Sequence, residues 1–318
     1  MQMSRVDGLD ARGASSPHAS TNGQRFVILF ILNNSSGTGN CDAITAQITE
    51  RFAALGEEVR IVLASTGEEM EWAAKEGIAA GATAVVAGGG DGTVSTVAAA
   101  LAGGGVPLGV LPLGTLNHFA KDLGIPLEAE EALEVIVAGH TMAVDAAEVN
   151  GKLFLNNASL GLYARIVRLR QRYRTRGIAK WFVAAWAMLK VMEQNPVFTV
   201  RIGANGENVT YRSSLVMVGN NAYRMEGLDV GSRESLTGGM LGVYVVQSDG
   251  KLALARLIWQ IITGRAREGE ELEVHQVTAA TVETGSSTMP VARDGEVEQL
   301  TLPLQFRTRP RLLEVLVP

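Results

Sequence analysis

Residues able to bind phosphate and metal gather in the glycine-rich stretch GGGDGT, residues 88–93. Glycines leave backbone N–H groups accessible to a bulky anion, and this stretch opens a helical segment whose positive end favours phosphate. An acid beside phosphates repels them unless it holds Mg²⁺ or caps the helix, so we expect Asp91 to take one of these roles. Thr93 adds a hydroxyl at the same place. A glycine-rich turn capped by an aspartate explains the stretch equally well.

Two further polar loops follow apolar, strand-like runs. NNSSGTGN, residues 33–40, comes after RFVILFIL, and LPLGTLNHFAKDLGIP, residues 111–126, again places Gly-Thr just before a helix. In the second loop Thr115 and Asn117 offer hydroxyl and amide contacts. Loops of this kind meet at the carboxyl ends of parallel strands, where ligands bind. Three converging loops therefore predict a site for a phosphorylated ligand.

Two better-known phosphate loops are absent from the sequence. No G-x-x-x-x-G-K-[ST] pattern occurs, which excludes a P-loop NTPase. GTGNCD after the first strand-like run also ends wrongly for the dinucleotide-binding pattern G-x-G-x-x-G. The phosphate-site hypothesis therefore depends on the three loops together.

Composition narrows the class of protein. A net charge of −5 and a pI of about 5.5 argue against a nucleic-acid partner. The single cysteine, Cys41, excludes an internal disulfide and suits a reducing, cytoplasmic compartment. The four histidines are scattered without zinc-ligand spacing. Residues 1–23 lack the apolar run of a signal peptide, so we expect a disordered lead-in there.

Alternating strand and helix patterns predict an α/β fold that starts with a doubly wound parallel sheet over residues 24–143. Continuous apolar runs such as VPLGVLP indicate strands that are covered on both faces. We interpret this part as the domain that carries the site for a phosphorylated ligand. The expected strands are 25–32, 58–64, 82–88 and 106–112, and the expected helices are 41–55, 67–81, 91–105 and 127–139.

The pattern changes after Met142, and residues 144–318 predict a mainly β second domain. Asn150-Gly151 is a strong hairpin signal between two strand-like runs. We expect the active site in the cleft between the two domains, which is a favoured place for ligands. Whether the last segment, 311–318, packs back on the first domain stays open. Further expected strands are 198–202, 208–220, 241–247, 273–284 and 300–309, interrupted by one long helix over 179–192.

A basic stretch, residues 164–180, carries seven Arg or Lys residues and no acid. The segment that follows places Trp181 and Phe182 on an apolar helical stripe. This combination is typical of docking on an anionic membrane surface, and equally of a core helix beside a solvated charged face. No window reaches about 18 consecutive apolar residues, so we expect no transmembrane helix.

Taken together, these motifs resemble the lipid kinases of the diacylglycerol kinase and sphingosine kinase superfamily, particularly its bacterial members. GGDGT alone is shared with NAD kinases and phosphofructokinases, whereas its combination with the P-x-G-T-x-N segment and a late D-G-E is more specific. The resemblance covers residues 24–318. The matching segments are NNSSGTG (33–39), GGDGT (89–93), PLGTLNHFA (112–120), DAAEVNGKLFLNNASLGL (145–162) and RDGE (293–296).

The resemblance implies ATP- and Mg²⁺-dependent phosphorylation of a lipid alcohol such as diacylglycerol. It implies that Asp294 is the general base, with Glu296 beside it and Asp91 as a further catalytic residue and metal ligand. A plain Asp-Gly turn is the alternative interpretation of Asp294. The implied nucleotide-binding residues are Asn33, Ser36, Gly89, Gly90, Gly92, Thr93, Gly114, Thr115 and Asn117.

Two positions depart from the family pattern. His118 stands where an acid is common, and Gly238-Gly239 replaces acids that in many bacterial members help to hold a structural Mg²⁺. These departures leave open a non-catalytic nucleotide or lipid sensor, and the shared GGDGT segment leaves open an NAD kinase-like kinase of a soluble nucleotide. A lipid substrate also implies transient contact with a membrane surface, and thus peripheral membrane association. The sequence identifies neither the lipid nor the oligomeric state, so a homo-oligomer stays open.

Overall fold

The computed structural model describes residues 27–34, 41–161, 164, 197–204, 206–224, 233, 235–247 and 272–318. The predicted lead-in, Ser36, nearly all of the basic stretch and the predicted helix over 179–192 lie outside these residues. Within them, no helix is both long and apolar enough to cross a bilayer.

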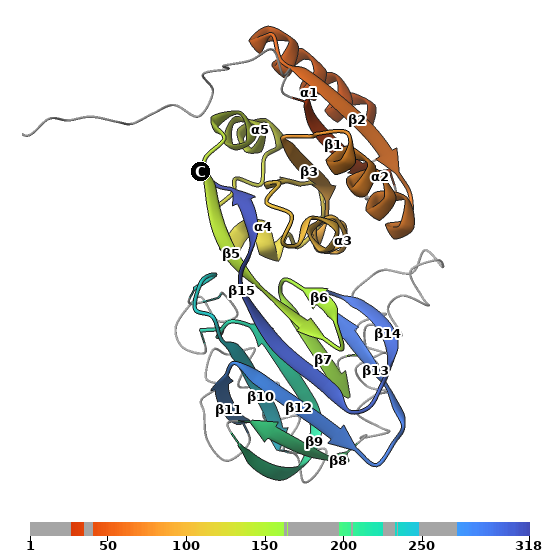
Figure 1. Cartoon of the computed structure of the whole chain (residues 1–318), viewed down its shortest axis with the longest axis vertical. Coiled ribbons are helices and arrows are strands. Elements are labelled where there is room, and N and C mark those ends of the chain that lie inside the picture. The colour runs from red at the N-terminus through yellow and green to blue at the C-terminus, as the bar shows by residue number, and fades with distance from the viewer. Residues whose placement is uncertain are drawn as a thin grey trace, which may run out of the picture.

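The first domain is a parallel sheet between helices (Figure 1). Its strands run in the order β4-β3-β1-β2, and every residue of β3 and β4 is buried. Helix α1 contacts α5, and α2 contacts α3. The predicted doubly wound sheet is confirmed. Its elements are β1 (Val27–Asn33), α1 (Cys41–Leu55), β2 (Glu58–Ala64), α2 (Gly67–Ala79), β3 (Ala84–Gly89), α3 (Asp91–Leu101), β4 (Leu108–Pro112), α4 (His118–Asp122) and α5 (Ala129–Ala138).

The second domain is formed by antiparallel strands, as predicted. The hairpin at Asn150-Gly151 is confirmed: both residues have positive φ, and Val149 pairs with Lys152 across the turn. Its strands are β5 (Thr141–Val149), β6 (Lys152–Phe154), β7 (Asn157–Gly161), β8 (Phe198–Ala204), β9 (Glu207–Asn220), β10 (Leu241–Gln247), β11 (Leu272–Val277), β12 (Ala279–Thr284), β13 (Thr288–Arg293), β14 (Glu296–Thr301) and β15 (Leu304–Leu316).

Two strand predictions need correction. The run 273–284 is not one strand, because the chain changes partner at Thr278: β11 pairs with β10, whereas β12 pairs with β8 and β15. The run 300–309 is likewise divided between β14 and β15, at a cis Leu302–Pro303 peptide bond. At each break, the two halves of a continuous β-prone segment pair with different strands.

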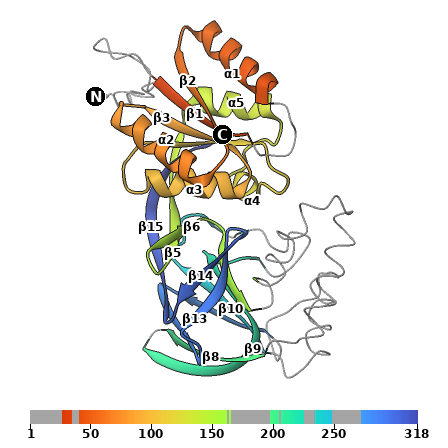
Figure 2. The same cartoon turned by 90° about the vertical axis from the view of Figure 1, so that its right-hand side faces the viewer.

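The last strand, β15, joins the two domains. It pairs with β12 and β5, and at Val315 it reaches Leu108 of β4. Leu313 and Val315 lie in the core of the first domain, whereas Phe306 lies in the core of the second. Figure 2 shows β5 and β15 running together from one domain into the other. This shared ladder positions the first domain's loops against the second domain.

The start of α2 offers a direct test of local stability. Thr66 caps the helix through a reciprocal capping box with Glu69: its hydroxyl accepts the Glu69 N–H at 3.2 Å, and its own N–H donates to Glu69 Oε2 at 3.3 Å. Thr66→Ala should lower the free energy of unfolding by about 1 kcal/mol in urea titration, because an N–H loses its acceptor. Thr49→Ala, at an exposed position inside α1, should not lower this free energy, because alanine favours a helix more than threonine and the lost hydroxyl only donates to the Thr45 carbonyl. Equal losses in the two variants would contradict this account.

Candidate active site

Two of the predicted loops pack directly on each other. Gly89 at the end of β3 pairs with Pro112 at the end of β4. A Cβ added to Gly114 would lie 2.4 Å from the Cα of Gly90, so the loops approach backbone to backbone. Gly90 is the N-cap of α3 and gives the helix no side-chain cap. The first turn of α3 therefore presents uncapped N–H groups, as a phosphate site requires.

Asn117 shapes the second loop from within. Its φ is 50°, its Oδ1 accepts the Gly114 N–H at 3.1 Å, and its Nδ2 donates to the carbonyls of Pro112 and Gly114 at 3.2 and 3.0 Å. The buried amide is thus used inside the loop. Thr115 and His118 are exposed. Contacts of this loop with a nucleotide stay a prediction.

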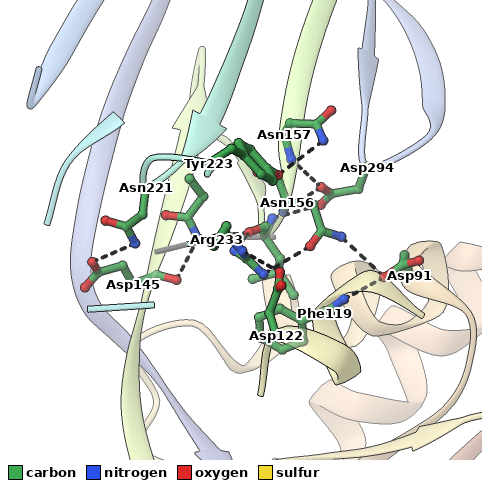
Figure 3. Close-up of polar contacts among 12 residues, drawn as sticks. Asp91, Phe119, Asp122, Asp145, Asn156, Asn157, Asn221, Tyr223, Arg233 and Asp294 are labelled. Carbon is green, nitrogen blue, oxygen red and sulfur yellow. Dashed lines mark hydrogen bonds and ion pairs between the residues drawn. The ribbon is translucent and has the colours of Figure 1, made fainter. Parts of the chain in front are cut away.

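Asp91 caps a different helix from the one expected. It is the first residue of α3, and its Oδ1 accepts the N–H of Phe119, in the first turn of α4, at 3.0 Å. Of the two roles left open for Asp91, the cap of its own helix is not observed, because its carboxylate accepts an N–H from the first turn of α4 instead. Figure 3 shows this contact. In the described part of the chain, Oδ2 of Asp91 receives no hydrogen bond.

That second oxygen suits Asp91 as a magnesium ligand. The described residues contain no cluster of three or more Asp, Glu, His or Cys that could hold a metal ion. Mg²⁺ in phosphoryl-transfer sites is commonly held by one or two carboxylates together with water and substrate phosphates. One open carboxylate oxygen beside a phosphate loop fits this arrangement.

Asn33 links the first strand to the glycine loop. Its Nδ2 donates to the Thr93 hydroxyl at 2.9 Å, and Thr93 is buried. The structure therefore brings Asn33, Thr93 and the Gly89–Gly92 loop together. Ser36, predicted beside Asn33, lies outside the described residues.

Asp294 occupies the turn between β13 and β14. It has φ 46° and is followed by Gly295 with φ 86°, so it is indeed in an Asp-Gly turn. Its Oδ1 accepts the N–H groups of Asn156 and Asn157 at 2.8 and 3.2 Å. Its Oδ2 accepts the Leu155 N–H at 2.8 Å and the hydroxyl of Ser95. The two interpretations are therefore not exclusive, because the turn holds a carboxylate that faces the glycine-loop helix (Figure 3).

Burial controls the charge of this carboxylate. It raises the pKa of Asp294 above its ordinary value, and the Ser95 hydroxyl and three backbone N–H groups oppose this by stabilising the charged form. A carboxylate with a raised pKa and fixed donors is suited to accept a proton.

A cavity of about 490 Å³ lies between the two domains. Gly92, Ser95 and Thr96 line it from α3, and Asp294 and Glu296 from the β13–β14 turn. Glu296 lies so close to α3 that a Cβ on Gly92 would be 3.2 Å from its Oε1. Two of the three predicted catalytic residues, Asp294 and Glu296, therefore line the cavity, and the third, Asp91, directly precedes the lining residue Gly92.

Sequence reasoning missed two cations on the cavity wall, Lys152 and Arg293. Both bind Glu298, Lys152 through an ion pair and Arg293 with Nε 3.0 Å from Oε1. Burial would raise the pKa of Glu298, but these two cations lower it below its ordinary value. The cavity wall also carries the acids Glu68, Glu71, Asp294 and Glu296, so these two cations offset part of a negative charge there. The one sequence feature that could have indicated them is their position inside two segments that resemble the family, residues 145–162 and 293–296.

Hydrogen-bond donors surround Asp145 beside Gly238-Gly239, where the family pattern has acids for a structural Mg²⁺. The buried carboxylate of Asp145 accepts the N–H of Gly239 at 2.6 Å, that of Arg311 at 2.9 Å and the amide of Asn221 at 3.1 Å. Gly238-Gly239 thus brings an N–H where the family pattern brings acids. Among the described residues, this donor set does not fit a metal ion.

Comparison with known proteins places both domains. The family model described as diacylglycerol kinase catalytic domain matches residues 27–149. The model described as YegS C-terminal NAD kinase beta sandwich-like domain matches residues 156–317. These regions agree with the resemblance drawn from the motifs.

Individual relatives give the same result. A diacylglycerol kinase of Mycobacterium tuberculosis is 28% identical over 91% of this chain and 94% of its own length. A probable lipid kinase YegS-like protein of Citrobacter koseri is 36% identical over 46% of this chain, and the match spans only 50% of that relative. A crystal structure of a diacylglycerol kinase from Bacillus anthracis str. Sterne has a TM-score of 0.68 at 22% identity, covering 92% of this chain and 97% of that one. The last comparison concerns the fold alone.

The glycine contact between the loops can be tested by mutation. Gly114→Ala would place a methyl group against the backbone of Gly90 and 2.6 Å from Asn117 Oδ1. We expect a loss of roughly 1–3 kcal/mol in unfolding free energy. A distortion worth about 1.4 kcal/mol at the glycine loop would weaken ATP binding about tenfold in calorimetry.

The matched control is Gly285→Ala, where an added Cβ meets nothing within 4 Å. This control measures the part of the change in unfolding free energy that comes from the lower conformational entropy of the unfolded chain. Equal stability and ATP affinity in both variants would show that the loops can separate without consequence.

Proposed function

This chain belongs to the bacterial lipid kinases of the diacylglycerol kinase type, and we propose that it transfers the γ-phosphoryl group of ATP to a hydroxyl of a lipid alcohol such as diacylglycerol. The observation that carries this proposal is the position of Asp294. Its enclosed carboxylate and the first turn of the glycine-loop helix line one cavity. A proton acceptor beside a phosphate loop is the minimum that phosphoryl transfer to an alcohol needs.

Several described groups fit a nucleotide and its metal. The uncapped first turn of α3 offers N–H groups to phosphates. Asp91 offers an oxygen to Mg²⁺, which when bound neutralises phosphate charge. Lys152 and Arg293 place cationic N–H groups on the cavity wall. The chain therefore supplies donors for each part of a metal–polyphosphate group.

In the proposed reaction, Asp294 accepts the proton of the lipid hydroxyl. The hydroxyl oxygen forms a bond to the γ-phosphorus, and the bond from that phosphorus to the β,γ-bridging oxygen breaks. Ser95 and the N–H groups of 155–157 hold the base in one orientation. Glu296, on the same wall, is the second acid near the acceptor. We also propose that the enzyme works at the cytoplasmic membrane surface, where its substrate resides.

A lipid panel with radiolabelled ATP and Mg²⁺ tests this function. We expect label in at least one lipid alcohol. Asp294→Asn should lower kcat by about 10²- to 10⁴-fold, because the acceptor for the proton is lost, with ATP affinity retained. Asp91→Asn should weaken ATP binding as well. Label in no lipid from a folded protein would sink the proposal, and NADP formation would point to a soluble nucleotide as acceptor.

The pH profile of kcat tests Ser95. A base acts when deprotonated, so activity rises with pH through the pKa of Asp294, which lies above the ordinary value. The Ser95 hydroxyl lowers that pKa, so Ser95→Ala should move the acidic limb to higher pH. Thr96→Ala, next along α3 but bonded to the Gly92 carbonyl at 2.9 Å, should leave the limb in place. A limb that stays put in Ser95→Ala would rule out Asp294 as the titrating base.

A further inference from the structure

Asn156 contacts both acids that the proposed reaction uses. Its backbone N–H donates to Asp294 Oδ1 at 2.8 Å, and its side-chain Nδ2 lies 3.4 Å from Asp91 Oδ1. Asp91 belongs to the first domain and Asp294 to the second. The residue is buried and lies in the bend between β6 and β7. One residue thus spans the distance from the glycine loop to the base (Figure 3).

Arg233 fixes the orientation of the Asn156 amide. Its Nη2 donates to Asn156 Oδ1 at 3.2 Å, and its Nη1 donates to the Leu155 carbonyl at 2.5 Å. A guanidinium only donates, so the amide oxygen must face Arg233 and the amide nitrogen must face Asp91. The Asn156 carbonyl in turn accepts the hydroxyl of Tyr223 at 3.1 Å. Burial raises the pKa of Tyr223 to about 12, so it stays a neutral donor.

The guanidinium is itself anchored in the first domain. Its side chain is fully buried, and its Nε lies 2.7 Å from Asp122 Oδ2 in α4. It also stacks over the ring of Phe119 at 5.6 Å, whose N–H binds Asp91. The contacts therefore close a ring: Arg233 to Asn156, Asn156 to Asp91, Asp91 to α4, and α4 back to Arg233.

We propose that Asn156, oriented by Arg233, is the positioning residue that sets the separation between the glycine-loop acid Asp91 and the base Asp294. This inference rests on the proposed function, which makes Asp294 the base. Phosphoryl transfer depends on placing the acceptor hydroxyl and the phosphate within a fraction of an ångström of reacting distance. Because the two acids come from different domains, a shared, rigid contact is what holds them in register.

Asn156→Asp is the sharpest test because it keeps the shape and the acceptor toward Arg233. It replaces the donor facing Asp91 with an oxygen, in a site already faced by Asp91, Asp122, Asp294, Arg233 and Tyr223. We expect kcat to fall about 10- to 100-fold at pH 8, with a smaller change in KM for ATP. The ratio of variant to wild-type kcat should fall as the pH falls, because the added carboxylate raises the pKa of Asp294 and the base is protonated at a higher pH.

Asn208→Asp is the matched control: the same substitution at an exposed position of β9. It should change neither kcat nor the pH dependence of the ratio. Arg233→Lys keeps the charge beside Asp122, but one ammonium group cannot also hold the Asn156 amide and the Leu155 carbonyl. Its kcat should fall less than that of Asn156→Asp, and its ratio to wild-type kcat should not change with pH. Wild-type kcat in both folded variants would overturn the inference.

A readout independent of turnover separates this inference from the proposed function. Carbon-13 NMR of labelled aspartate follows the titration of Asp294 directly. Asn156→Asp should move that titration to higher pH, whereas Asn208→Asp should not. An unchanged titration in Asn156→Asp would overturn the positioning role even if the wild-type protein is a kinase. A shifted titration in a protein that labels no lipid would instead leave the linkage standing and remove the function.

Discussion

Three consecutive backbone N–H groups, those of residues 155–157 at the bend between β6 and β7, hold the carboxylate of Asp294. A buried carboxylate is tolerated only when its oxygens are satisfied. Strand β6 ends at Phe154 and β7 begins at Asn157, so Leu155 and Asn156 lie in a bend outside the sheet ladder. The break between these strands frees N–H groups that a continuous strand would have used. The turn that carries Asp294 returns the contact, because its own N–H donates to the Asn157 carbonyl at 2.9 Å.

Charge balance between the domains follows from the same constraint. Asp91, Asp122 and Asp294 surround the buried guanidinium of Arg233 directly or through Asn156. Removing one partner of a buried ion pair typically costs about 3–5 kcal/mol, because an uncompensated charge stays behind. The interface between α4 and the β6–β7 bend is therefore specified by charge as well as by shape. The β5–β15 ladder holds the two domains next to each other. The contacts around Arg233 then fix the position of α4 relative to the β6–β7 bend.

Regular elements could be predicted well from the sequence, because each has a local cause. Continuous apolar runs marked β1, β3 and β4, and Asn150-Gly151 marked its hairpin. Partner choice could not be predicted, since the division of 273–284 into β11 and β12 depends on β8 and β10, which are distant in sequence. The helix that Asp91 caps could not be predicted for the same reason. Its carboxylate accepts an N–H of α4, which follows the next strand in the sequence.

The site shows the same limit. GGDGT and RDGE pointed to Asp91 and Asp294, but no local pattern indicated Ser95, Asn156 or Arg233, whose roles exist only once the two domains meet. Arg233 in particular is isolated in the sequence and becomes meaningful through Asp122 and Asn156. Chemistry-bearing motifs thus indicate what a site does, whereas the residues that hold it in register come from the tertiary contacts.

The lining of the cavity also constrains how a lipid would be recognised. Among its described lining residues, Ala99 alone has an apolar side chain, and the other side chains there are charged or hydroxyl-bearing. Burying an acyl chain against such groups would leave charges and hydroxyls without water or partners. The cavity is therefore suited to phosphates and to a polar head group with its hydroxyl, and we expect the hydrocarbon of the substrate to lie outside it. In the proposed reaction, the acceptor would be selected by the position of one hydroxyl relative to Asp294, and an acyl chain could stay in the bilayer while that hydroxyl is presented.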